Sequence, residues 1–129
     1  MKKKLALLLL AVMLLTACGQ AAKNQQEAVY LNITAEEAKK IMDSEEGYVI
    51  LDVRTREEYD QGHIPGAVLI PNTEIAARAE EELTDKSQLI LVYCRSGRRS
   101  KLAAEELVAL GYTNIREFGG IIDWPYEVE

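Results

Sequence analysis

One cysteine lies among three arginines and two serines in the segment VYCRSGRRS, residues 92–100. The thiolate is the reactive form of cysteine, and it is favoured by nearby cations and by a helix N-terminus. Backbone N–H groups in a tight turn before a helix also bind anions, and Gly97 gives such a turn its conformational freedom. The segment therefore predicts a site that holds an anion against the nucleophilic sulfur of Cys94.

Two chemistries suit an anion beside a reactive cysteine: phosphoryl or arsenate transfer, and sulfur transfer through a cysteine persulfide. Cysteine-based phosphatases place five residues between the cysteine and an arginine that forks onto the phosphate. Here Ser100 occupies that position, and Arg99 comes one residue too early. The shorter loop favours one extra sulfur atom on Cys94 over a tetrahedral oxyanion. A phosphatase or arsenate reductase remains an alternative, as does a non-catalytic module that senses sulfur or binds a partner.

The composition is that of an ordinary α/β protein with a single domain. The chain has 129 residues, 48% of them hydrophobic and 28% charged, with a formal net charge of −6. This length supports one hydrophobic core and is too short for two. Because an acidic chain is a poor partner for nucleic acid, we expect no nucleic-acid binding.

The N-terminus has the regions of a secretory signal peptide. Lysines occupy positions 2–4, an apolar run extends from Leu5 to Leu15, and small residues follow it. A membrane-spanning helix needs about 20 apolar residues, so a permanent transmembrane helix is disfavoured. Loss of this leader removes three of the 15 basic residues, which leaves 12 against 21 acidic residues and a net charge of −9.

The cysteine that follows this leader resembles a lipid-attachment site. Residues 15–18 read LTAC, similar to the bacterial lipoprotein box, which implies cleavage before Cys18, diacylglycerol on its sulfur and an acyl group such as palmitate on its amino group. The alternative is a simple secretory leader with an incidental cysteine. We predict a lipoprotein signal peptide at 1–17, a lipidated cysteine and flexible tether at 18–28, and a folded domain at 29–129. This domain is expected on the extracytoplasmic side of the cell membrane, held by its lipid anchor.

Apolar runs and capping signals predict strands that alternate with helices. The expected strands are 30–33, 48–53, 68–70, 89–93 and 114–118. The expected helices are one from the capping box at 34–37 to Gly47, and others at 55–60, 73–83 and 100–110. Such alternation predicts a parallel sheet with helices on both faces, in which ligands bind beyond the carboxyl ends of the strands. The strand at 89–93 leads directly into Cys94 at that edge.

Three motifs together resemble the single-domain rhodanese family. They are GYVILDVRTREEYDQGHIPGAVLIP at 47–71, the cysteine loop YCRSGRRS, and the closing GGIIDW; the similarity covers about 30–124. The resemblance implies an α/β fold in three α/β/α layers, with a five-stranded parallel sheet whose second and fourth strands are adjacent. It implies no cofactor beyond the transferred sulfur. The tail PYEVE after Trp124 departs from the glycine-containing ending often found in the family.

The same resemblance implies a sulfurtransferase. Such an enzyme takes sulfane sulfur from a small anionic donor such as thiosulfate onto Cys94 and passes it to cyanide or a thiol, with a thioredoxin-like protein as a candidate acceptor. The loop amides would stabilise the persulfide, and the loop arginines would attract and orient the donor. The implied substrate-binding residues are Arg95, Ser96, Gly97, Arg98, Arg99 and Ser100.

Three further residues are expected to support the site without acting on the substrate. Asp52 and Arg54 follow the second predicted strand, and we interpret them as an ion pair that braces the cysteine loop. His63 lies in GHIPGA and is expected to support its own loop. Because it is the only histidine, no histidine cluster for a metal exists, and we expect no metal site.

Overall fold

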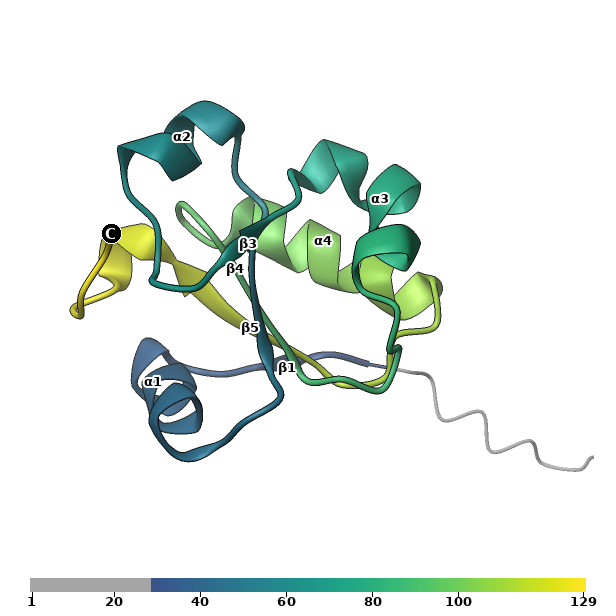
Figure 1. The fold of residues 1–129 in the computed structure, drawn as a ribbon, viewed down its shortest axis with the longest axis horizontal. Helices are drawn as coiled ribbons and strands as arrows, with labels where there is room; N and C mark the ends of the chain where they lie inside the picture. Colours follow the sequence, from purple (N-terminus) through teal and green to yellow (C-terminus); the bar gives the residue numbers. More distant parts are fainter. Residues whose placement is uncertain (1–28) are drawn as a thin grey trace, which may run out of the picture.

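The computed structural model describes residues 29–129. The predicted signal peptide, the lipidation site at Cys18 and the tether lie outside the described residues. Five parallel strands form one sheet in the order β1-β5-β4-β2-β3 (Figure 1). The strands are β1 (Leu31–Asn32), β2 (Val49–Asp52), β3 (Val68–Leu69), β4 (Ile90–Cys94) and β5 (Ile115–Gly120). The adjacency of β2 and β4 confirms the predicted topology.

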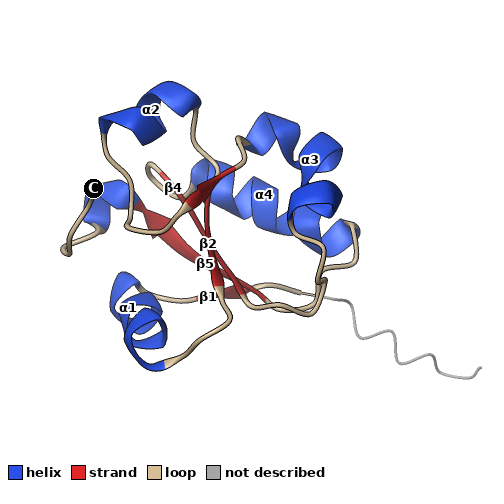
Figure 2. Cartoon of the chain, in the orientation of Figure 1, coloured by secondary structure: helices blue, strands red, loops and turns tan. Residues whose placement is uncertain are grey.

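Helices cover both faces of the sheet (Figure 2). They are α1 (Ala35–Ser44), α2 (Arg56–Gln61), α3 (Ile75–Glu82) and α4 (Arg98–Ala109), with short 3-10 turns η1 (Asn72–Glu74) and η2 (Ile121–Asp123). Helix α1 packs on one face, and α3 and α4 pack together on the other. This arrangement confirms the predicted three-layer α/β/α fold.

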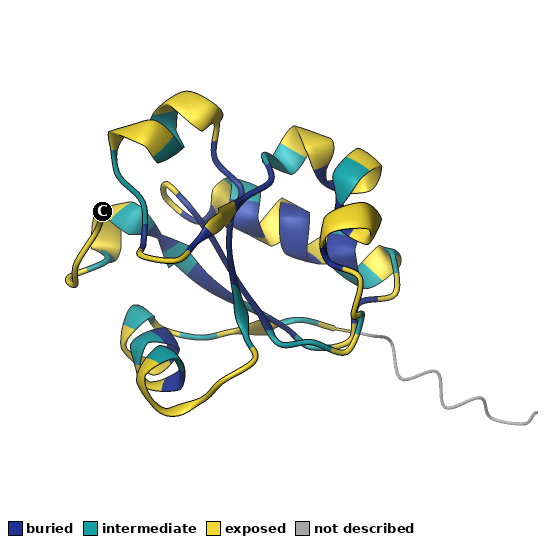
Figure 3. Ribbon diagram, viewed as in Figure 1, coloured by how far each residue is buried: buried dark blue, intermediate teal, exposed yellow. Residues whose placement is uncertain are grey.

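Strand β4 is the centre of the core, and all five of its residues are buried (Figure 3). Because side chains alternate along a strand, Ile90, Val92 and Cys94 contribute to the core beneath α3 and α4, whereas Leu91 and Tyr93 contribute to the core beneath α1. The nucleophile candidate therefore sits at the end of a strand whose position is fixed from both sides.

Several predicted boundaries are wrong by one to three residues; the helix predicted at 73–83, for example, begins at Ile75 because the 3-10 turn η1 precedes it. Helix α1 ends at Ser44, before Gly47, because the backbone becomes extended at Glu45. Helix α4 begins at Arg98 and not at position 100, since the left-handed φ of 105° at Gly97 turns the chain straight from β4 into the helix. Strand β5 continues through its two glycines to Gly120.

Among residues 29–129, each helix is too short or too polar to span a bilayer.

Candidate active site

Cys94 ends β4 and is buried directly under the first turn of α4. Its Sγ accepts a hydrogen bond from the Gly97 N–H at 3.0 Å and lies 3.4 Å from the Ser100 Oγ. The thiol is not in a disulfide, and the residue has no exposed surface. The tight turn and the helix N-terminus thus direct the Gly97 N–H toward the sulfur, where such a donor stabilises negative charge.

Gly119 and Gly120, which end β5, pack against the backbone of the cysteine loop. A methyl group on Gly120 would collide with the carbonyl of Arg95 and with Ser96. The Arg95 carbonyl also accepts a hydrogen bond from the Ile122 N–H at 3.2 Å. Only a glycine at position 120 lets the two backbones approach so closely. The sequence analysis used this glycine as a motif and assigned it no such role.

Ser100 and Glu117 form a buried polar pair behind the sulfur. Ser100 is fully buried, and the Glu117 residue is 2% exposed. The Ser100 Oγ lies 3.2 Å from the Glu117 Oε2, which also accepts the Gly119 N–H at 2.8 Å. The sequence analysis missed Glu117, although alternation along the predicted strand places it on the same face as Ile115, toward the helix that follows Cys94.

The three arginines of the cysteine loop differ in exposure and in their ion-pair partners. Arg95 and Arg98 are exposed. Arg99 instead donates two hydrogen bonds to Glu58, at 2.7 Å to Oε1 and 2.9 Å to Oε2. The hydrogen bonds from Arg99 have the largest effect on the pKa of Glu58. They outweigh burial, which acts in the opposite direction, and lower this pKa to about 2. Arg99 is therefore already paired, which changes the expectation that all three arginines face the donor.

Asp52 and Arg54 form the predicted ion pair, with 2.6 Å between Oδ2 and Nη2. The Tyr93 hydroxyl donates to the same Asp52 oxygen at 2.6 Å, and the Arg54 Nη2 donates to the Gly62 carbonyl at 2.7 Å. The Tyr93 hydroxyl in turn accepts the Ile64 N–H at 3.1 Å. Burial, with this hydrogen bond to Asp52, raises the pKa of Tyr93 well above 10.0. The cluster braces the GHIPGA loop, whereas the sequence analysis assigned it to the cysteine loop.

His63 lies within its own loop and against the C-terminal tail. Its ring stacks on Tyr59 at 3.7 Å between centroids, and Nδ1 lies 2.9 Å from the Tyr59 carbonyl. Its backbone exchanges two hydrogen bonds with Glu129. These contacts are those of a supporting residue, and the supporting role itself stays a prediction. No cluster of three metal-ligating side chains occurs within residues 29–129.

An open cleft of about 350 Å³ lies between the cysteine loop and α2. The cysteine loop contributes Arg95, and the opposite wall contributes Arg54, Glu58 and Gln61. The remaining lining residues are Gly62, Ile121 and Val128. Arg95, the residue after Cys94, brings positive charge to this cleft, whereas Cys94 itself is buried and does not line it.

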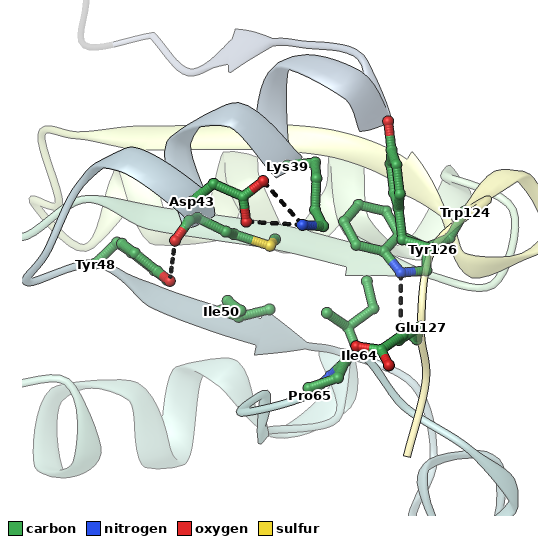
Figure 4. Close-up of a pocket in the computed structure, with 10 residues that line it drawn as sticks. Lys39, Asp43, Tyr48, Ile50, Ile64, Pro65, Trp124, Tyr126 and Glu127 are labelled. Carbon is green, nitrogen blue, oxygen red and sulfur yellow. Dashed lines mark hydrogen bonds and ion pairs between the residues drawn. The ribbon is translucent and has the colours of Figure 1, made fainter.

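A second hollow, of about 200 Å³, lies on the α1 side of the sheet (Figure 4). Figure 4 shows Lys39 paired with Asp43 and lying next to the aromatic side chains of Trp124 and Tyr126. The Lys39 Nζ lies 2.7 Å from the Asp43 Oδ1. No residue of the cysteine loop lines this hollow. The cleft beside Arg95 is therefore the candidate active site.

Comparisons with known proteins found related sequences and related folds. The family model described as rhodanese-like domain matches residues 34–125. A putative sulfur carrier protein, YrkF of Bacillus subtilis, is 41% identical over 98 residues, which cover 75% of this chain and 52% of YrkF. The chain thus spans about half the length of that relative. The thiosulfate sulfurtransferase PspE of Escherichia coli is 41% identical over 73 residues, which cover 57% of this chain and 70% of PspE.

Solved structures show the same fold. A rhodanese with anions from E. coli superimposes with a TM-score of 0.60 at 36% identity, and the match covers 64% of this chain and 96% of that one. The Alr3790 protein from Anabaena sp. gives a TM-score of 0.70 at 31% identity, covering 75% of this chain and 90% of that one.

Proposed function

This chain belongs to the rhodanese-like domain family, and from that premise we propose that it is a sulfurtransferase whose Cys94 carries the transferred sulfur as a persulfide. The observation that carries the proposal is the position of the Cys94 Sγ, 3.0 Å from the Gly97 N–H at the start of α4, in a loop whose next residue, Arg95, lines the cleft. The relative PspE is named a thiosulfate sulfurtransferase, which supports a small anionic donor of that kind.

The proposed reaction has two half-reactions. The Cys94 thiolate attacks the outer sulfur of thiosulfate, so that a new S–S bond forms on Sγ while the donor's S–S bond breaks and its electron pair leaves with sulfite. Arg95 orients the anion in the cleft. Cyanide or a thiolate, for example that of a thioredoxin-like protein, then attacks the outer sulfur of the persulfide and releases the Cys94 thiolate.

The phosphatase or arsenate reductase alternative is disfavoured by the same loop. Its arginine comes one residue early, and the guanidinium of Arg99 already donates two hydrogen bonds to Glu58. Hydrolysis of an aryl phosphate, assayed beside sulfur transfer, separates the two activities. Substantial hydrolysis that disappears in Cys94→Ser is the result that restores the alternative.

A sulfur carrier is the second candidate function, because YrkF is named a putative sulfur carrier protein. Steady-state assays with thiosulfate and cyanide distinguish a carrier from an enzyme. An enzyme gives ping-pong kinetics, which Cys94→Ser abolishes and the control Ser44→Ala retains, since Ser44 is exposed at the end of α1 and lies outside the cysteine loop. A carrier accepts sulfur once but does not turn over with these substrates.

We also propose that lipid on Cys18 anchors the domain to the extracytoplasmic face of the cell membrane. The support is the sequence LTAC after an apolar leader. Growth of the native cells with labelled palmitate should label the protein, and Cys18→Ser should remove the label and release the protein from the membrane fraction. Labelling that persists in Cys18→Ser contradicts this part of the proposal.

A further inference from the structure

Three exposed cations, in the cysteine loop and the first turn of α4, have no carboxylate partner among the described residues. They are Arg95, Arg98 and Lys101, which we call the basic patch. Residues 29–129 include 11 basic and 20 acidic residues, a net charge of −9. Six of the 11 basic residues form an ion pair, so three of the five that do not are in the basic patch. The basic patch is therefore a local concentration of unpaired positive charge on an acidic domain.

The position of these cations does not stabilise the helix. A helix N-terminus carries a partial positive charge, which disfavours cations in the first turn. Arg98 and Lys101 both lie in the first turn of α4, which has no acidic residue. They are three positions apart, so their like charges also lie on neighbouring parts of the helix surface. A role in binding explains a placement that helix stability does not.

Most of the basic patch lies outside the cleft that we assign to the small donor. Of its three residues, only Arg95 lines that cleft. The family resemblance implies that Arg98 also binds the donor, but neither Arg98 nor Lys101 is a lining residue. A small anion held in the cleft therefore leaves these two cations unused. The basic patch as a whole fits a larger surface that carries several negative charges.

Two exposed apolar side chains lie beside the basic patch. Leu102 is 51% exposed and Ile122 is 59% exposed. Leu102 follows Arg98 by four positions on α4, which puts the two side chains on the same face of the helix. The Ile122 N–H donates to the Arg95 carbonyl at 3.2 Å, so Ile122 lies next to the cysteine loop. Protein–protein interfaces are enriched in arginine and bury apolar side chains, and this surface offers both.

We propose that the basic patch docks a protein acceptor whose cysteine is flanked by acidic and apolar residues. The inference rests on the sulfur transfer proposed above. The acceptor thiolate attacks the outer sulfur of the persulfide, so that a new S–S bond forms on the acceptor while the bond to the Cys94 Sγ breaks and its electron pair returns to Sγ. To do so, the acceptor must bring the surface around its own cysteine against the cysteine loop.

Complementary charge on that surface would raise the rate of association and orient the encounter. Carboxylates beside the acceptor cysteine would pair with the basic patch, and apolar side chains would cover Leu102 and Ile122. A protein with a small acidic area fits better than an anionic membrane, because an extended anionic surface also repels the remaining, acidic part of the domain.

The first measurement is binding without sulfur chemistry, by fluorescence anisotropy with the full chain. The probe is a labelled peptide in which aspartates and leucines flank a central serine. Lys101→Glu should raise its Kd about fivefold, and the variant should fold, because an acidic residue is favourable in the first turn of a helix. The matched control Lys40→Glu reverses an exposed cation on α1 that also has no ion pair in the described part of the chain, and its Kd should change by less than about twofold.

Three results of this measurement overturn the proposal. One is an equal Kd in Lys101→Glu and Lys40→Glu. Another is tighter binding of a counterpart peptide with lysines in place of the aspartates. The third is displacement of the acidic peptide by phosphatidylglycerol vesicles but not by phosphatidylcholine vesicles, which identifies an anionic lipid surface as the occupant. At about 1 M salt, where the Debye length is about 3 Å, the difference between wild type and Lys101→Glu should disappear.

The second measurement is sulfur transfer to the same acidic peptide with a cysteine in place of its serine. Lys101→Glu should lower the rate of transfer to the peptide about fivefold and leave the turnover of thiosulfate and cyanide unchanged, because Lys101 does not line the cleft. An equal loss of turnover with cyanide shows that Lys101 acts on the small substrates, and it overturns the docking proposal. Absence of any persulfide on Cys94 contradicts the proposed function instead, since the binding measurement involves no sulfur transfer.

Discussion

Two carboxylate–arginine pairs lie beside the cleft, and they differ in burial. In the Asp52–Arg54 pair the side chains are 0% and 6% exposed, whereas in the Glu58–Arg99 pair they are 25% and 30% exposed. Removal of one partner from a buried pair leaves an uncompensated charge, while separation of a partly exposed pair costs little. The first pair is therefore part of the fold, and the second can exchange partners. We infer that an anionic donor can draw Arg99 away from Glu58.

The largest effect is expected for Asp52→Asn. The variant leaves the Arg54 guanidinium buried without its counter-ion and weakens the bond from the Tyr93 hydroxyl. The free energy of unfolding should fall by about 3–5 kcal/mol, measured by chemical denaturation. Asp43→Asn, which removes the exposed partner of Lys39, is the control and should cost less than about 0.5 kcal/mol. Equal losses of stability in Asp52→Asn and Asp43→Asn would contradict the claim that the buried Asp52–Arg54 pair is part of the fold.

A smaller effect, on binding, is expected for Glu58→Gln. Freed from the carboxylate, Arg99 becomes available to the donor, so the KM for thiosulfate should decrease about two- to fivefold while kcat changes little. The free energy of unfolding should fall by less than about 1 kcal/mol, because glutamine keeps an acceptor for the Thr55 N–H in the capping box of α2 and only the partly exposed ion pair is lost.

Glu57→Gln is the matched control for this variant, since Glu57 is an exposed neighbour on the same helix. Its KM for thiosulfate should equal that of the wild type. An increased KM in Glu58→Gln shows instead that Glu58 orients Arg99 for the donor, and it contradicts an exchange of partners.

The smallest effect concerns the pH dependence of stability. The pKa of Glu58 is about 2 in the folded chain, against an ordinary value of 4.5. The folded state thus binds fewer protons, and the contribution to stability is complete above pH 4.5 and is lost as the pH falls toward about 2. The difference in melting temperature between wild type and Glu58→Gln should narrow in that window. Glu37→Gln alters a capping box whose glutamate has no arginine partner. The difference in melting temperature between wild type and this variant should narrow less over the same pH range.

Much of this fold follows from local sequence signals. The capping box at Thr34 forms as predicted, because it joins residues three positions apart. Thr55 forms a second capping box with Glu58, which the sequence analysis did not single out. The apolar run of β4 predicts a buried central strand that ends at Cys94. The glycine at position 97 likewise predicts a tight turn, and its left-handed conformation turns the chain into α4.

The contacts that distinguish the site are not local, and the sequence analysis could not identify them. Arg99 and Glu58 are 41 positions apart and meet only because α2 packs beside the start of α4. Glu117 reaches Ser100 across 17 positions, since β5 lies next to β4. Both partners depend on strand order and on helix placement, which no single segment specifies.

The central claim is tested most directly by intact and peptide mass spectrometry of the full chain after incubation with thiosulfate. The account predicts the mass of one added sulfur on the peptide that contains Cys94, which a reducing agent removes. Cys94→Ser should remain unmodified, and Ser44→Ala, which alters an exposed serine outside the cysteine loop, should react like the wild type. An unmodified Cys94, under conditions in which a control thiosulfate sulfurtransferase is persulfidated, contradicts the account.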